Sequence, residues 1–268
     1  NFRWDAYLNF THYTNKIIML PDTHKNREID GYLGYASGNK FVAEGLPLNT
    51  FLMPKYAGVD KETGKSLWYM DVKDKQGNIT GQTTTSEYTD ATQYLCGDPT
   101  PDLYGGFGTS LRVYGFDLSA QFSFQLGGRY YDGTYQSLMH TDSSVGSAWH
   151  KDVLESWSEE NRNSDIPRLD GDTSIGQSPV DRFLISSNYL SINNVTVGYT
   201  FPSKWMEKLK IAGVRVYFTA DNLAVASARK GVDPRYSIGL GSLTSGSGLN
   251  SGSYSAMRTL TGGITITF

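Results

Sequence analysis

Six segments of this 268-residue chain alternate apolar and polar side chains over about ten residues each, and this pattern restricts the fold more than any other feature. Successive side chains of a β-strand point to opposite faces, so each segment predicts a strand with one apolar and one polar face. The segments are 1–11, 107–114, 116–127, 189–201, 213–222 and 257–268. Two weaker strands are expected within 41–57 and 66–73, which makes about eight strands in all.

Two architectures fit such strands, and the connections between them favour one. A secreted sandwich would bury the apolar face, whereas an outer-membrane barrel would turn it to lipid and keep the polar face inside. A strand that crosses a membrane at a tilt needs roughly 9–11 residues, which matches these segments. The short connections at Gly115 and 202–212 alternate with the long ones at 129–187 and 223–256, as periplasmic turns alternate with extracellular loops. The pattern favours the barrel and leaves the sandwich as an alternative.

The composition agrees with strands joined by long polar loops. The chain has 29 glycines and 18 tyrosines, and its net charge of −3 gives no support for a nucleic-acid partner. No apolar run approaches the ~18 residues of a transmembrane helix. Because the first residues already alternate, we expect that a leader was removed just before them or that the chain is a piece of a longer one.

The sequence contains no motif that predicts catalysis or a bound metal. The four histidines lack the spacing of a zinc site. Asp170 and Asp172 lie in the turn-like "LDGDTS" without the rest of a calcium loop. Adjacent carboxylates such as Glu159 and Glu160 are better explained as solvated charges than as the acid pair of a glycosidase. We therefore expect no metal, no cofactor and no enzymatic activity.

Several long motifs, in order along the chain, resemble one protein family. They are "GDPTPDLYGGFGTSL" and "GFDLSAQFSFQLGGRYYD" within 97–132, "WSEENRNSDIPR" at 157–168, "YLSINNVTVGYTFPSKWMEKLKIAGVRVYFTADNL" at 189–223, "KGVDP" at 230–234 and "MRTLTGGITITF" at 257–268. These segments are similar to the late strands and loops of the SusC/RagA-type TonB-dependent outer-membrane transporters.

The resemblance implies a fold, a location and partners. Members of that family are 22-stranded antiparallel barrels with a plug and long extracellular loops, in the outer membrane of Gram-negative bacteria. They import oligomeric nutrients, glycans or peptides, together with a SusD-type surface lipoprotein that lids the barrel and a TonB complex that energises transport. Residues 1–268 would be the C-terminal segment of the barrel. The plug, the TonB-contacting part and the earlier strands would lie outside this chain and complete it.

Two groups of residues are candidates for a role in transport. Aromatic rings in or beside the expected extracellular loops could stack on cargo, although they could equally pack the loops together: Trp68, Tyr69, Tyr130, Tyr131, Trp149 and Trp157. Polar side chains on the inner face of the strands are expected to line a hydrated lumen: Asp117, Gln121, Gln125, Arg215 and Asp221.

Three local features complete the expectations. Residues 147–157 space Trp149, Val153 and Trp157 as a short amphipathic helix would, and 202–210 predicts a helical turn at the periplasmic face. The terminal aromatic Phe268 is expected to serve as a signal for barrel assembly. A small passive barrel and a secreted glycan-binding sandwich remain as alternatives to the importer.

Overall fold

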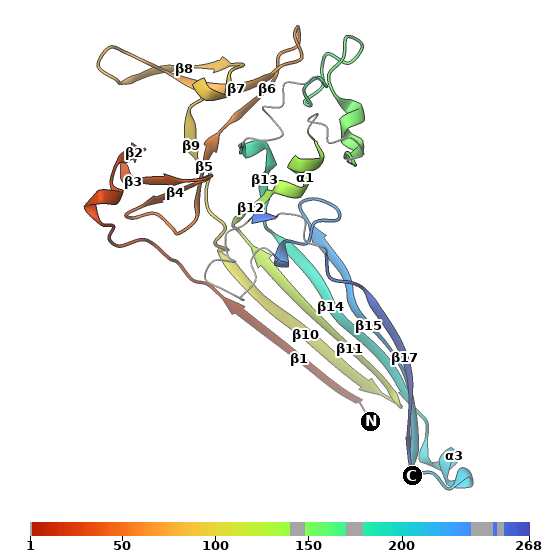
Figure 1. Ribbon diagram of the computed structural model, residues 1–268. Helices are drawn as coiled ribbons and strands as arrows, with labels where there is room; N and C mark the ends of the chain where they lie inside the picture. Colours follow the sequence, from red (N-terminus) through yellow and green to blue (C-terminus); the bar gives the residue numbers. More distant parts are fainter. Residues whose placement is uncertain (1, 140–147, 170–178, 237–248, 251–254) are drawn as a thin grey trace.

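The computed structural model describes residues 2–139, 148–169, 179–236, 249–250 and 255–268 (Figure 1). Six long strands form one antiparallel sheet in the order β1-β10-β11-β14-β15-β17. Their bounds are β1 (Phe2–Thr11), β10 (Leu103–Val113), β11 (Phe116–Leu126), β14 (Tyr189–Thr200), β15 (Gly213–Ser227) and β17 (Thr259–Thr267). These are the six strands that the alternating segments predict, and they confirm the all-β fold.

The two weaker strands expected in the barrel wall belong elsewhere. Residues 41–57 and 66–73 do contain strands, but these lie in two small sheets of their own within the connection from β1 to β10, so the long sheet has six described strands in place of eight. The first small sheet contains β2 (Arg27–Ile29), β3 (Tyr32–Ser37), β4 (Lys40–Ala43), β5 (Thr50–Pro54) and β9 (Gln93–Leu95). The second contains β6 (Tyr56–Val59), β7 (Ser66–Lys73) and β8 (Ile79–Thr85).

The remaining elements are short. A third small sheet joins β13 (Leu184–Ser186), β12 (Arg129–Asp132) and β16 (Leu249–Asn250). The α-helices are α1 (Gly133–Leu138) and α3 (Ser203–Met206). The 3₁₀ helices are η1 (Asp22–His24), η2 (Tyr88–Asp90), η3 (Lys151–Glu155), η4 (Asp181–Phe183), η5 (Glu207–Leu209) and η6 (Pro234–Tyr236). The described part of the chain holds no helix of the length and apolar character needed to span a membrane.

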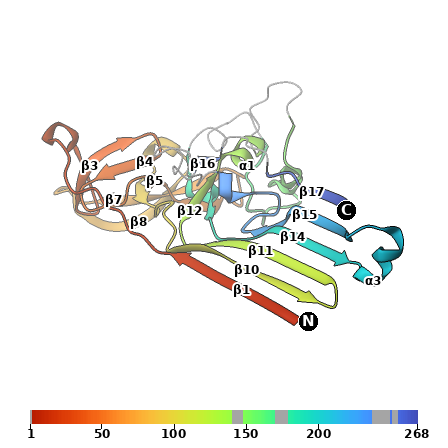
Figure 2. The ribbon, with the colours of Figure 1, turned by 90° about the horizontal axis from the view of Figure 1, so that it is seen from below.

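The connections of the long sheet differ between its two ends. The two small sheets built from β2 to β9 lie at one end, here called the loop end, and α3 lies at the opposite end, here called the turn end (Figure 1 and Figure 2). At the turn end β10 and β11 join through Tyr114 and Gly115, whose φ angles of 47° and 89° suit a two-residue type I′ hairpin. The predicted helical turn at 202–210 is confirmed by α3 and η5, whereas the expected helix at 147–157 is reduced to the 3₁₀ helix η3.

The buried apolar core of the described residues lies in the loops and not under the long sheet. One cluster gathers side chains from β5, β7, β12, α1, η3 and η4 and from the residues that flank α1 and η4: Phe51, Met53, Trp68, Tyr131, Tyr135, Met139, Val153, Val180 and Phe183. A second, smaller cluster packs on the five-stranded sheet of β2, β3, β4, β5 and β9. The apolar face of the long sheet, by contrast, is open: Val197 is 46% exposed, Phe218 50% and Ile266 50%. Figure 1 shows that sheet as a single layer, so no second layer built from the described residues covers these side chains.

Candidate functional site

The polar face of the long sheet is continuous from strand to strand because the register aligns it. Tyr7 lies opposite Gly108, which lies opposite Gln121, and the row continues through Asn194 and Asp221. The next row towards the turn end contains Ser110, Ser119, Thr196, Thr219 and Thr261. Hydroxyl, amide and carboxylate groups thus cover one face, while the opposite face is apolar. In outer-membrane barrels, a sheet with two such faces separates lipid from water.

An ion pair crosses the polar face between strands that are not neighbours. Asp117 on β11 and Arg215 on β15 are separated by β14, yet the Arg215 Nη2 and Nε atoms lie 2.5 Å and 3.0 Å from the two Asp117 carboxylate oxygens. Gly198 of β14 lies directly beneath the pair, and a Cβ there would be 2.7 Å from Asp117 Oδ1. The pair lines an open cavity of about 660 Å³ at the turn end, which Arg112 also borders. Two parallel hydrogen bonds between a guanidinium and a carboxylate fix both groups in place.

A β-bulge places two successive amides on the polar face. The register of β14 shifts at Asn193 against both of its neighbours, so Asn193 and Asn194 both take part in contacts on this face. Asn194 donates to Asp221 at 2.7 Å, and Asn193 accepts from Ser123 at 3.1 Å. Asn193 therefore becomes available as an acceptor at the loop end of the sheet.

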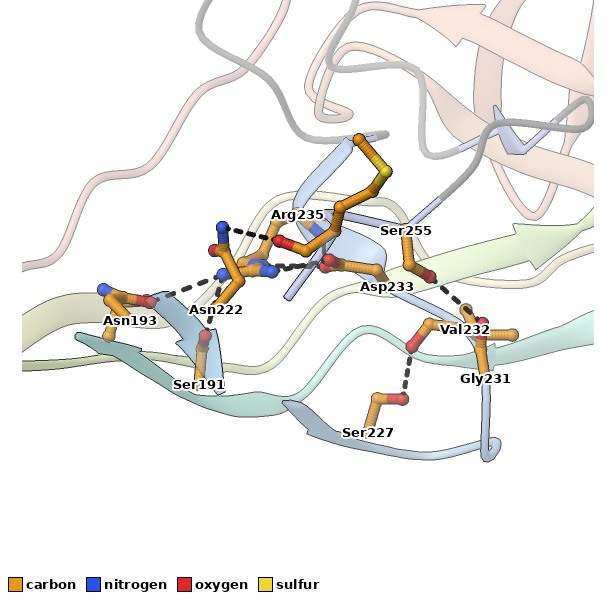
Figure 3. Close-up of polar contacts among 11 residues, drawn as sticks. Ser191, Asn193, Asn222, Ser227, Gly231, Val232, Asp233, Arg235 and Ser255 are labelled. Atoms are coloured by element: carbon orange, nitrogen blue, oxygen red, sulfur yellow. Dashed lines mark hydrogen bonds and ion pairs between the residues drawn. The ribbon is translucent and has the colours of Figure 1, made fainter. Parts of the chain in front are cut away.

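The segment after β15 is fastened to that bulge (Figure 3). Arg235 donates from Nε and Nη2 to the two carboxylate oxygens of Asp233 at 2.8 Å and 2.6 Å, and from Nη1 to Ser191 Oγ at 2.8 Å. A longer contact of 3.4 Å reaches Asn193 Oδ1. The Asp233 side chain is only 3% exposed and that of Arg235 19%. The ion pair therefore holds residues 233–235 against the polar face of β14.

A second arginine links the same segment to the loops. Arg229 Nε lies 3.0 Å from Asp132 Oδ2, and the guanidinium lies over the Tyr135 ring at 3.5 Å. The other oxygen of Asp132 accepts from the Tyr135 backbone N–H and so caps α1. Residues 229–235 thus connect the loop core to the inner wall of the sheet.

The aromatic candidates separate into two sets by burial. Trp68, Tyr130 and Tyr131 are 1%, 2% and 5% exposed, so neighbouring side chains enclose their rings. This corrects the expectation that they could meet cargo, because a fully enclosed ring has no free face for stacking. The other candidates keep open surface: Tyr69 is half-buried, Trp149 is 47% exposed, and Trp157 is half-buried.

The predicted polar residues lie on the face that the alternation assigns to them. Gln121 and Asp221 belong to the first polar row described above, and Asp117 and Arg215 form their ion pair on the same face nearer the turn end. Gln125 differs, because it is 2% exposed and donates to Ser187 Oγ at 2.9 Å. Gln125 therefore joins the sheet to the loop layer at the loop end. Phe268 follows β17 and is 92% exposed.

One lysine of the loop layer has an unusual environment. Lys40 is 8% exposed, its Nζ lies 3.2 Å from the centroid of the Phe51 ring, and it donates to the Asn49 carbonyl at 3.1 Å. Burial lowers the pKa of Lys40 to about 7, against an attraction from Asp98 that acts in the opposite direction. Burial also raises the pKa of the Cys96 thiol to about 11, which keeps it protonated and inert.

No group of three or more His, Cys, Asp or Glu side chains that could hold a metal ion occurs within the described residues. His140, Asp170 and Asp172 lie outside those residues, as does most of the Gly/Ser-rich stretch 239–255.

The sequence patterns did not predict that residues 229–235 bind to the polar face of β14 and to the loop core. The signal for this contact was present in two places: the doubled Asn193-Asn194, which breaks the alternation of its strand, and the charges of "KGVDPR". Neither signal says that the two segments meet.

Comparisons with known proteins cover the whole chain. It is 26% identical over 293 residues to TonB-dependent receptor P3 of Formosa agariphila, a match that covers 100% of this chain and 27% of that protein. It is 26% identical over 246 residues to the TonB-dependent receptor SusC of Bacteroides thetaiotaomicron, covering 90% of this chain and 23% of SusC. No family model matches the chain. The chain thus spans about a quarter of the length of the curated relatives it matches.

A solved structure agrees with these relatives. The RagAB peptide transporter superposes with a TM-score of 0.76 at 26% identity and covers 100% of this chain and 27% of that chain. The relatives are receptors and transporters, and none is named as an enzyme. In its two-faced sheet, its packed loop layer and its sequence, the chain is similar to part of the β-barrel of the SusC/RagA-type TonB-dependent outer-membrane transporters.

Proposed function

We propose that this chain forms part of the wall and extracellular loops of a TonB-dependent importer of oligomeric nutrients, glycans or peptides. The observation that carries the proposal is the sheet with one exposed apolar face and one continuous polar face. The apolar face would contact lipid, and the polar face would line a hydrated path. In outer-membrane barrels the long loops face the outside and the short turns face the periplasm, so the loop end would receive cargo.

The polar face has the chemistry for a path that does not retain its cargo. Asp117 and Arg215 neutralise each other, and Asn194 donates to the Asp221 carboxylate, so these four polar groups already have hydrogen-bond partners within the wall. An oligomer with many hydroxyl or amide groups could exchange hydrogen bonds with such a wall at a small net cost, because each protein contact replaces one with water.

Cargo contacts, in this proposal, come from the aromatic rings that keep open surface. Trp149 and Tyr69 are the best placed for stacking on a sugar face or an apolar side chain. Trp157 contributes less, since it donates from Nε1 to the Lys61 carbonyl at 3.2 Å and packs against Gly64. The similarity to the RagAB peptide transporter supports the peptide class, and the glycan class follows from the resemblance of the sequence motifs to the family. By the same comparison, the barrel would act with a SusD-type lipoprotein as its lid and with the TonB complex.

The two alternatives have less support. A secreted sandwich needs a second layer over Val197, Phe218 and Ile266, and these remain about half exposed. A small passive barrel would need the six strands to close on themselves, whereas β1 and β17 are both edge strands of an open sheet.

The proposal is tested with the full-length gene in its own host. Deleting that gene should abolish growth on one class of oligomer, glycan or peptide, while growth on the corresponding monomer continues. Removing TonB from the wild-type strain should give the same loss. Uptake that persists without TonB would support a passive barrel, and unchanged growth of the deletion strain on both classes would refute import. Trp149→Ala should reduce uptake of the dependent oligomer, whereas Trp68→Ala should lower the amount of folded protein.

A further inference from the structure

The helical turn at the turn end leans onto the apolar side of the sheet. Phe116 and Tyr199 are register partners on that face, with ring centroids 4.6 Å apart. Phe201 stacks edge-on against Tyr199 at 5.1 Å, and Trp205 follows Phe201 at 6.2 Å. The four rings form a row that leads from the lipid-facing surface into α3. The turn therefore lies at the border of the apolar band and not under the polar face.

The same turn combines an exposed indole with positive charge. Trp205 is 59% exposed, while its neighbour Met206 is buried at 7% exposure. Lys204, Lys208 and Lys210 are all exposed, and they are opposed within 203–210 by the single carboxylate of Glu207. Three lysines against one glutamate leave the turn with a net charge of +2.

An indole and lysines at the border of an apolar band match the chemistry of a phospholipid surface. Tryptophan prefers the headgroup level, and lysine can lay its methylene chain along apolar surface while its ammonium reaches the phosphate layer. Lysine close to an anionic leaflet strengthens binding by about fivefold per residue. Because the short turns of such barrels face the periplasm, the surface at hand is the phospholipid of the inner leaflet.

We propose that residues 202–210 form a binding surface for anionic phospholipid headgroups, with Trp205 at the interface and Lys204, Lys208 and Lys210 on the phosphates. The aromatic row sets the depth of the turn, and the lysines select anionic over zwitterionic lipid. This surface is independent of the cargo and of the lid protein.

The test uses the full-length protein in neutral detergent, titrated with fluorescent phosphatidylglycerol and, for reference, fluorescent phosphatidylcholine. The variant K204Q/K208Q/K210Q should weaken phosphatidylglycerol binding at least fivefold and leave phosphatidylcholine binding unchanged. The variant K204R/K208R/K210R, which keeps the charge, should bind as the wild type does. A matched control removes three exposed lysines of the loop layer in K61Q/K73Q/K75Q and should also bind as the wild type does.

The wild-type protein supplies a second measurement that needs no substitution. Its preference for phosphatidylglycerol should fall as salt rises, because exposed charges are screened. A salt-independent preference, equal weakening in the loop-lysine control, or loss of binding in the arginine variant would each overturn the proposal.

Discussion

The ion pair of Asp233 and Arg235 gives the sharpest test of how residues 229–235 are held on the barrel wall. Replacing Arg235 with alanine removes three hydrogen bonds of 2.6–2.8 Å and leaves the Asp233 carboxylate, 3% exposed, without its counter-charge. Removing one partner of a buried pair typically costs about 3–5 kcal/mol. Since the Arg235 side chain keeps 19% exposure, the lower end applies, about 3 kcal/mol. That corresponds to a factor of roughly 100 in the equilibrium between the fastened and released segment.

Hydrogen exchange of the peptide 227–236 in the full-length protein measures this equilibrium. Arg235→Ala should speed its exchange roughly 100-fold in the regime where exchange follows the opening equilibrium. The double variant R235A/D233A should exchange much more slowly than the single one, because no unpaired carboxylate is left behind.

An exposed ion pair provides the control. Arg3 and Asp5 are also bonded at 2.8 Å, but their side chains are 70% and 54% exposed. Arg3→Ala should leave the exchange of 227–236 unchanged, since water replaces a pair of this kind. Unchanged exchange in Arg235→Ala, or a double variant as loose as the single one, would refute the reasoning.

Three further predictions concern single positions. The pKa of Lys40 is about 7 in the folded protein and 10.5 ordinarily, so the unfolded chain binds more protons than the folded one between these pH values. The free energy of opening the five-stranded sheet that contains β4 should therefore rise by about 2 kcal/mol from pH about 7 to about 9. Hydrogen exchange corrected for intrinsic rates measures this rise, and Lys40→Met should abolish it. Gly64 has φ +73°, and a Cβ there would overlap the Trp157 ring. Gly64→Ala should therefore lower the stability of the loop by about 1–3 kcal/mol and speed tryptic cleavage at Lys61 and Lys65. Gly77→Ala, at φ +88° with open space around the Cβ, should show only the smaller cost of the backbone conformation, and equal effects of the two variants would contradict the overlap. Gly198→Ala should displace the Asp117–Arg215 pair and lower the temperature at which the barrel unfolds, measured as the heating step at which it shifts to the unfolded position on a gel. Gly262→Ala, where a Cβ would meet open space, should leave that temperature unchanged. The effect of Gly198→Ala should vanish in a D117N/R215Q background, and its persistence there would exclude the pair as its cause.

The alternating pattern located the long strands well because it reports a local property. Side chains of a strand must alternate, so the six segments and their two faces follow from the chain itself. The predicted strand ends were wrong where the residues interrupt the alternation of apolar and polar side chains. β10 begins at Leu103, before the expected 107, because Gly105 and Gly106 carry no side chain to show the alternation. β15 continues to Ser227, beyond the expected 222, because Asn222 takes a positive φ of 50° and shifts the pattern.

The loop layer was harder to predict. The strands within 41–57 and 66–73 have the same local preferences as barrel strands, but they are shorter and pack into small sheets of their own. Whether such a strand joins the long sheet or a small sheet of the loop layer depends on its burial, and burial depends on contacts with residues distant in sequence. Trp68, Tyr130 and Tyr131 show the same effect: as residue types they suit a binding surface or a core, and only the packing of β7 and β12 with α1 and η4 encloses them.

The sequence by itself determined which side chains share a face, because the geometry of an extended chain sets that period locally. The tertiary structure decided which polar groups meet across that face. Asp117 reaches Arg215 only because β14 lies between their strands with a glycine at the crossing point. Asn193 meets Ser123 and Arg235 only because a bulge turns an extra amide inward. Such meetings depend on strand order and register, which arise from the whole sheet and not from any one segment.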